Sequence, residues 1–333
     1  MRPLTLASPL VLVLALAASC GREPRQHPDA GPDSGVPPPP DDGGSFVLAN
    51  WNVRYFGDTA MDPDAGALQQ QNVTSILRDA GFDIAGLQEI VDAARLQAVV
   101  AALPGYDAIL SSDGARVSGT SSCASFGDPL CYSPAEQKVA LLYRTQVASV
   151  RSAQLILTGD SSLEYAFAYR PPLRVDLDLR LQDGGTEPIV VIVLHLKAYG
   201  DLASRDRRQI SSAALKAYLD STLPAEKVAV VGDWNDDLDF STAGGTSPFQ
   251  NFLDDPARYR FVTGVLTQGN IGTTGWGTPI DHQLVTDELL PWLRAGSVSV
   301  LHPAQWGDPD YSPESRYSTT TSDHWPVISR WQR

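Results

Sequence analysis

The chain has 333 residues, of which 43% are hydrophobic, which is enough for one large globular domain with a substantial core. Its 25 Lys and Arg residues against 39 Asp and Glu residues give a net charge of −14. This charge argues against a protein that holds nucleic acid by neutralising its phosphates. It does not exclude an enzyme that contacts nucleic acid briefly while divalent cations cover part of the repulsion.

The segment 1–19 predicts an export signal that is not part of the fold. Arg2 supplies a positive charge, and the apolar run 9–18 is too short to span a bilayer. The small residues that lead into Cys20 resemble a bacterial lipoprotein signal, which implies that Cys20 is lipidated and becomes the mature N-terminus. Because Ala17 stands where leucine is more usual, ordinary secretory cleavage is the alternative. We therefore expect a lipoprotein of the bacterial cell envelope or cell surface, or otherwise a secreted protein.

The segment 20–44 predicts a disordered tether, because its Pro, Asp and Gly residues cannot bury apolar surface. Such a tether holds a domain away from an anchor, and the lipid on Cys20 is the only membrane contact that we expect. The rest of the chain, 45–333, contains no internal repeat and no second linker, which predicts one catalytic domain. We expect this domain to be a monomer.

Two cysteines remain in the domain, Cys123 and Cys131. Export makes a disulfide between them plausible, and its nine-residue loop would contribute roughly 2.5 kcal/mol through loop entropy. The alternative is a pair of free thiols in a surface loop.

Apolar runs and helical periodicity alternate along the domain without a strict βαβ rhythm. Strands are predicted at 46–53, 82–87, 106–110, 139–143, 173–179, 189–196 and 228–231, and helices at 67–78, 92–103 and 204–219. In some strands apolar and polar residues alternate, as in LRVDLDLR, which predicts a strand with one covered face. Others are continuously apolar, as in IVVIVLHL, which predicts a strand covered on both faces. This mixture predicts an α/β domain in which two sheets pack on each other with helices outside.

Polar residues interrupt or follow several of these strands. They occur in the stretches NWN at 50–52, QE at 88–89, VLHLK around His195, GDWN at 232–235 and SDH at 322–324. Each has an ordinary structural explanation, such as a turn residue or a buried histidine. Together they supply what a site needs to bind a hard cation, neutralise a phosphate and move a proton.

The stretches NWNVRYFG, LQEI, YRPP, LHLKA, GDWN, IDHQLV and SDHWPV follow one another along the chain. In this order they resemble the motifs of the endonuclease/exonuclease/phosphatase superfamily, most of all its deoxyribonuclease I branch. The resemblance covers about residues 46–330. It implies a four-layer α/β/β/α sandwich of two mixed sheets, with the active site at one edge of both sheets.

The resemblance also implies a metal site. Glu89 matches the main Mg²⁺ ligand of the family, with Asn52 and Asp323 nearby. Carboxylate and amide oxygens suit a hard cation that keeps several waters. We expect Mg²⁺ as the cofactor. Mn²⁺ could replace it, and a separate Ca²⁺ could have a structural role.

A catalytic histidine pair is implied in the same way. His324 matches a catalytic histidine, and Asp281 matches the carboxylate that orients it and raises its basicity. His195 matches the second histidine around the scissile phosphate. Which histidine acts as general base and which as general acid stays open at this stage.

Three further residues complete the implied site. Asp233 and Asn235 match the pair that positions the attacking water and stabilises charge at phosphorus. Arg170, in YRPP, matches an arginine that clamps phosphate oxygens.

The sequence departs from the nuclease pattern at two places. A glutamate supports the second histidine in that branch, whereas this chain offers Glu136 or, in a gapless alignment, Gln137. His282 stands where an arginine is common, so different substrate contacts are expected there. Separately, a cluster of three arginines, Arg205, Arg207 and Arg208, opens a predicted helix and suits either a phosphate backbone or a solvated helix face.

The function predicted from these features is a secreted or surface-anchored, Mg²⁺-dependent phosphodiesterase. Its expected substrate is nucleic acid, DNA or RNA, cut with little sequence preference. The alternative is a phosphatase or a phospholipid or sphingomyelin phosphodiesterase of the same superfamily. The acidic chain favours the alternative slightly, but GDWNDD lacks the basic residue that inositol phosphatases tend to carry after this motif.

Overall fold

The computed structural model describes residues 44–58, 60, 66–124, 131–132, 136–181, 183–308, 310 and 312–333. The predicted signal and all but the last residue of the tether lie outside these residues. Within the described part of the chain, no helix is both long enough and apolar enough to cross a membrane.

The first sheet has six strands in the order β11-β12-β1-β2-β4-β3. Their bounds are β1 Ser45–Phe56, β2 Ile84–Ile90, β3 Tyr106–Leu110, β4 Lys138–Arg144, β11 Ser299–Val300 and β12 Val327–Gln332. The central strands β1 and β2 are parallel, and the other pairs in this sheet are antiparallel.

The second sheet also has six strands, in the order β5-β6-β7-β8-β10-β9. Their bounds are β5 Ala148–Leu155, β6 Leu173–Arg180, β7 Thr186–His195, β8 Val228–Asp233, β9 Tyr259–Phe261 and β10 Asp281–Thr286. Here β7 and β8 are the parallel pair. Each sheet is therefore mixed, with its parallel pair at the centre.

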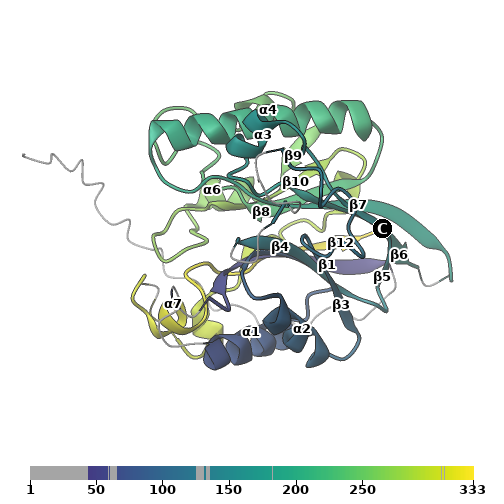
Figure 1. Cartoon of the computed structure of the whole chain (residues 1–333), viewed down its shortest axis with the longest axis vertical. Helices are drawn as coiled ribbons and strands as arrows, with labels where there is room; N and C mark the ends of the chain where they lie inside the picture. The colour runs from purple at the N-terminus through teal and green to yellow at the C-terminus, as the bar shows by residue number, and fades with distance from the viewer. Residues whose placement is uncertain are drawn as a thin grey trace, which may run out of the picture. The chain divides into compact units, whose positions relative to one another are not determined.

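Helices cover the outer faces of the two sheets, as Figure 1 shows. On the side of the first sheet lie α1 Gly66–Ala80, α2 Ala93–Ala101 and α7 Arg316–Thr320. On the side of the second sheet lie α3 Ser161–Ala166 and α4 Leu202–Thr222. The shorter helices are α5 Gln250–Leu253, α6 Gly264–Gly269, η1 Leu290–Trp292 and η2 Pro303–Trp306.

Aspartates fix where several helices begin. Asp92, Asp160 and Asp201 each accept hydrogen bonds from backbone N–H groups in the first turn of α2, α3 and α4. These caps satisfy donors that have no partner inside the helix.

The core lies in three layers. The middle layer joins the two sheets and includes Leu48 and Ile84 from one and Val193 and Val231 from the other. Gly86 allows this contact, because a Cβ at this position would lie 2.5 Å from a methyl carbon of Val231. The outer layers join each sheet to its helices.

The predicted α/β/β/α sandwich is confirmed, and all ten predicted strands and helices are present. The predicted disulfide between Cys123 and Cys131 is present as well. Additional strands and short helices were not predicted: β5, β9, β10, β11, β12, α3, α5, α6, α7, η1 and η2.

Candidate functional site

Strand register aligns three of the predicted site residues across the second sheet. His195 ends β7 directly beside Asp233, which ends the parallel strand β8. Asp281, at the start of β10, pairs with Asp233 from the other side because β10 runs antiparallel to β8. The row His195–Asp233–Asp281 thus follows from the hydrogen-bonded ladder.

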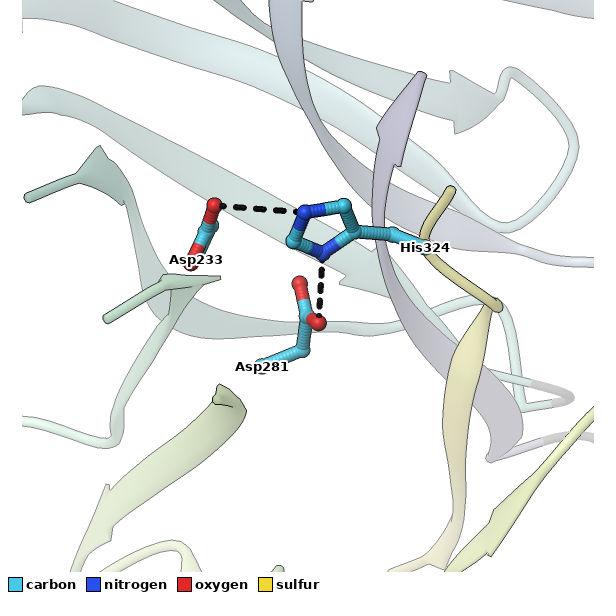
Figure 2. Close-up of side chains that lie close together, drawn as sticks. All are labelled: Asp233, Asp281 and His324. Carbon is cyan, nitrogen blue, oxygen red and sulfur yellow. Dashed lines mark hydrogen bonds and ion pairs between the residues drawn. The ribbon is translucent and has the colours of Figure 1, made fainter. Parts of the chain in front are cut away.

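His324 meets this row from the segment just before β12 in the other sheet. Its Nδ1 lies 2.8 Å from Oδ2 of Asp281, and its Nε2 lies 3.8 Å from Oδ2 of Asp233 (Figure 2). Thr273 Oγ1 donates to Asp281 Oδ2 at 2.7 Å, and Asn50 Nδ2 lies 3.3 Å from Oδ1. These bonds fix the carboxylate, so His324 is oriented with Nε2 toward Asp233.

Asp233 lies between the two histidines. Its Oδ2 is 3.4 Å from Nε2 of His195 and accepts a hydrogen bond from Nδ2 of Asn52 at 3.0 Å. Its Oδ1 accepts from the backbone N–H of Asn235 at 2.9 Å. Because Asp233 is almost fully buried, its charge depends on these neighbours.

The environment moves the three titrating groups in different directions. Burial lowers the pKa of His195 well below its usual value, and the positive charges of Arg170 and His324 act in the same direction. Burial also disfavours the charged form of His324, but Asp281 and Asp233 outweigh it and raise the pKa well above the usual value. Burial raises the pKa of Asp233 to about 7. Near neutral pH, His195 is therefore neutral and His324 is charged, so the two imidazoles are suited to different roles.

The predicted metal ligands lie on the side of the site formed by β1 and β2. Glu89 accepts a hydrogen bond from Asn52 Nδ2 at 3.0 Å and from the backbone N–H of Tyr55 at 2.8 Å. Asp323, next to His324 in the chain, has its Oδ2 3.9 Å from Nε of Arg54. The donor set fits a hard divalent cation, because two carboxylates and an amide offer oxygen ligands.

A second group could also hold a metal ion. One ligand atom each from Asp233, Asp281 and His324 lies within 4.8 Å of the others, and all three side chains are buried. In the structure, the histidine in this group is hydrogen-bonded to Asp281.

Backbone strain occurs at two of the predicted site residues. Glu89 has φ of +62° and Asn235 has φ of +57°, a region that residues other than glycine rarely adopt. At Glu89, the register between β2 and its neighbours also shifts. Such strain is characteristic of functional positions, where the surroundings hold a side chain in one direction.

Arg170 occupies the back of the site. Its Nε donates to the carbonyl of His195 at 3.2 Å, its Nη2 donates to the carbonyl of Leu196 at 2.6 Å, and its Nη1 donates to Oε1 of Gln137. It is only 7% exposed. In this structure the guanidinium binds the protein itself, and its role as a phosphate clamp stays a prediction.

The second histidine has no supporting residue at its other nitrogen. Among the described residues, Nδ1 of His195 is buried without a hydrogen-bond partner. Neither Glu136 nor Gln137 therefore bonds to this nitrogen, and Gln137 contacts Arg170 instead.

His282 does not contact substrate itself, because it alternates with Asp281 along β10 and is fully buried between Thr263 and the carbonyl of Asp236. The expectation of different substrate contacts at this position stays a prediction. For Arg208, both expected positions were wrong. Arg208 is neither on a solvated face nor available to a phosphate backbone. It is fully buried, with Nη2 2.8 Å from Oδ2 of Asp236.

The other two arginines of that cluster have partners on the protein. Arg205 donates to the carbonyl of Thr246, and Arg207 donates to the carbonyl of Tyr165.

Three groups around the site were not assigned roles from the sequence. Asn50 and Thr273 hold Asp281, and the backbone N–H of Tyr55 holds Glu89. Asn50 could have been found, because it stands two residues before Asn52 on the same strand and therefore on the same face. Thr273 and the N–H of Tyr55 gave no sequence signal.

Carboxylates, amides and two histidines at one edge of a two-sheet sandwich are the groups that hydrolysis of a phosphate ester requires. The chain also matches the model of the Endonuclease/Exonuclease/phosphatase family over residues 49–324. It belongs to this family, whose members are phosphoesterase hydrolases. A comparison with curated proteins finds no match.

Solved structures share the fold at low sequence identity. TDP2 of D. rerio complexed with a single-strand DNA product is 13% identical, with a TM-score of 0.57 over 87% of this chain and 99% of that chain. The catalytic domain of human nocturnin with bound sulfate is 13% identical, with a TM-score of 0.54 over 87% and 93%. A mannosyl-6-phosphatase of Bacteroides thetaiotaomicron is 18% identical, with a TM-score of 0.54 over 86% and 100%.

Proposed function

We propose that the protein is a divalent-metal-dependent phosphodiesterase that hydrolyses nucleic acid, DNA or RNA, with little sequence preference. The observation that carries the proposal is the position of Asp233 between His195 and His324, with the carboxylate of Glu89 3.8 Å from Nε2 of His195. This arrangement offers separate groups for the water and for the leaving oxygen of a phosphodiester.

The division of roles follows from the two imidazoles. Charged His324, held by Asp281, has a proton at Nε2 to give to the leaving oxygen. Asp233, fixed by the N–H of Asn235, is placed to orient a water and accept its proton. Neutral His195 can donate a hydrogen bond to a phosphate oxygen without competing for that proton.

Glu89, Asn52 and Asp323 would hold Mg²⁺. When bound, this ion would neutralise phosphate charge and favour the departing oxygen.

An exported location completes the proposal. The disulfide between Cys123 and Cys131 supports an oxidising compartment. Lipidation of Cys20 is checked by fractionation: the wild-type protein should partition with membranes, and Cys20→Ser should release it or stall its processing. Wild-type protein found wholly in the medium would rule out the anchor.

The activity is tested by incubating the 45–333 domain with plasmid DNA, RNA, sphingomyelin, inositol phosphates and mannose 6-phosphate, with and without EDTA. We expect cleavage of the nucleic acids, lost in EDTA. Hydrolysis of the phosphomonoesters or of sphingomyelin alone would replace the nuclease by the alternative of a phosphatase or a lipid phosphodiesterase.

A further inference from the structure

Exposed tyrosines and basic side chains occur in α3, in the loop between β7 and α4, and in α4. Figure 1 shows that α3 lies beside α4. Tyr199, in the loop between β7 and α4, is 73% exposed, and Tyr165, in α3, is 49% exposed. Lys197 and Arg207 lie against these two rings. We call these four residues the tyrosine strip.

Each tyrosine ring of the strip forms a cation–π contact with one of the basic side chains. Nζ of Lys197 lies 4.1 Å from the ring centre of Tyr199, and Cζ of Arg207 lies 3.9 Å from the ring centre of Tyr165. Neither cation forms an ion pair with a carboxylate among the described residues, although the chain carries a net charge of −14. The strip is therefore a positive and aromatic surface on an acidic protein.

The strip begins at the site itself. Lys197 follows Leu196, whose carbonyl accepts hydrogen bonds from Arg170 and Asn235. A strand whose phosphate is bound at Asp233 would thus pass over the strip.

The loop that carries Tyr199 is held in an unfavourable conformation. Tyr199 has φ of +83°, and buried Arg208 donates to the carbonyls of Lys197 at 2.7 Å and Tyr199 at 2.9 Å. Arg208 is itself fixed by Asp236. The backbone at Tyr199 is therefore strained while its large aromatic ring is exposed to solvent. Neither feature stabilises the fold, so both point to a function for the ring.

We propose that the tyrosine strip binds a single-stranded segment of the nucleic acid next to the scissile phosphate. The rings stack on bases, and Lys197 and Arg207 meet backbone phosphates. This inference rests on the proposed function and specifies its substrate as unpaired strands. A lipid surface fits less well, because phenol rings capped by cations present little aliphatic surface to acyl chains.

The test measures binding rather than turnover. Fluorescence anisotropy of a labelled phosphorothioate single strand would measure its binding to the full-length protein in Mg²⁺. A length of about 10 nucleotides covers a typical binding site for a stacked strand. We expect Tyr199→Ala to weaken binding about 10-fold or more and Tyr199→Phe to keep most of it, because the ring does the stacking. Lys197→Gln should lower the slope of log affinity against log salt by about 0.7.

Arg180→Gln is the matched charge control. Arg180 is exposed and pairs with Thr186, at the end of β7 opposite to His195. The Arg180→Gln variant should bind the single strand with an affinity and a salt slope close to those of the wild type. A duplex of the same sequence should bind more weakly than the single strand.

Three results would overturn the inference. The first is no detectable binding of the single strand by the wild-type protein, and the second is equal binding of it by Tyr199→Ala and wild type. The third is binding to anionic vesicles, abolished by Tyr199→Ala, by a wild-type protein that does not bind the oligonucleotide. If single strands bind in a way that depends on Tyr199 but are not hydrolysed, the strip is supported and the proposed phosphodiesterase activity is rejected. If single strands are hydrolysed equally well with and without the Tyr199 ring, the phosphodiesterase is supported and the strip is rejected.

Discussion

Asp281 and His324 lie 43 residues apart in the chain, the first at the start of β10 in the second sheet and the second just before β12 of the first sheet, yet Oδ2 of Asp281 is 2.8 Å from Nδ1 of His324. Both side chains are buried, and Asp281 is also held by Thr273 and Asn50. The pair therefore joins the two sheets at the site edge. It also fixes which nitrogen of His324 faces Asp233.

This pair should act as one unit in turnover. We expect His324→Ala to lower kcat by on the order of 10²–10⁴, the usual loss for a missing general acid or base. Asp281→Asn should cost less, and the double variant should be scarcely worse than His324→Ala, because both changes affect the same step. Steady-state kinetics on a phosphodiester would check this. Losses that multiply in the double variant would separate the two residues.

Metal removal should abolish activity. Glu89 is held by Asn52 and by the N–H of Tyr55 and offers oxygen ligands only, so EDTA should stop turnover and Mg²⁺ or Mn²⁺ should restore it. Glu89→Gln removes one negative charge from the metal site and should weaken Mg²⁺ binding, so excess Mg²⁺ should recover part of the lost rate. A Mg²⁺ titration of both proteins measures this shift. Full activity of the wild type in EDTA would contradict the metal site.

Buried His282 should make stability depend on pH. Burial lowers the pKa of His282 to about 4, so below about pH 6.5 the unfolded chain takes up a proton that the folded chain refuses. Stability is therefore lost as the pH falls from 6.5 toward 4, by roughly 3 kcal/mol over about 2.5 pH units. His282→Gln should remove this loss.

The measurement is the free energy of unfolding in urea at several pH values. Asp237 complicates the wild-type curve, because burial raises its pKa to about 6 and its contribution has the opposite sign. Only the difference between wild type and His282→Gln reports on His282. A difference that stays constant from pH 7 to 4.5 would show that His282 titrates normally.

The buried ion pair of Arg208 and Asp236 should matter far more than an exposed pair on the same helix. Arg208→Met leaves Asp236 buried without its cation, which should cost about 3–5 kcal/mol, and adding Asp236→Asn should recover part of the loss. Lys216→Met removes two partly exposed pairs, one with Asp220 in α4 and one with Asp255, and should cost only about 1 kcal/mol in total. Equal losses in urea unfolding would argue that Arg208 is not specially placed.

Much of the fold could be predicted because long apolar runs dominate its central strands. The strands that were missed lack this signal: β9 and β11 are very short, and β10 begins with three buried polar residues, Asp281, His282 and Gln283. Polar side chains in a strand are acceptable when tertiary partners satisfy them, and such partners are invisible in a linear pattern.

The same reasoning explains which site features were missed. A polar residue after an apolar run marks an edge, so Asp233 and Asn235 could be selected from the sequence alone. Whether Arg208 faces solvent or Asp236, and which face of β10 carries His282, depends on helix rotation and strand register. These are set by packing between distant segments.

The strand order of the first sheet has a consequence for synthesis. β12 is hydrogen-bonded between β11 and β1, and Ser45 at the start of the domain pairs with Gln332 near its end. A ribosome must therefore release residues 327–332 before this sheet can close, and His324 emerges only just ahead of them. Until then, β1 lacks its partner on one side and the site lacks His324, so the chain can acquire hydrolytic activity only after residues 327–332 have left the ribosome.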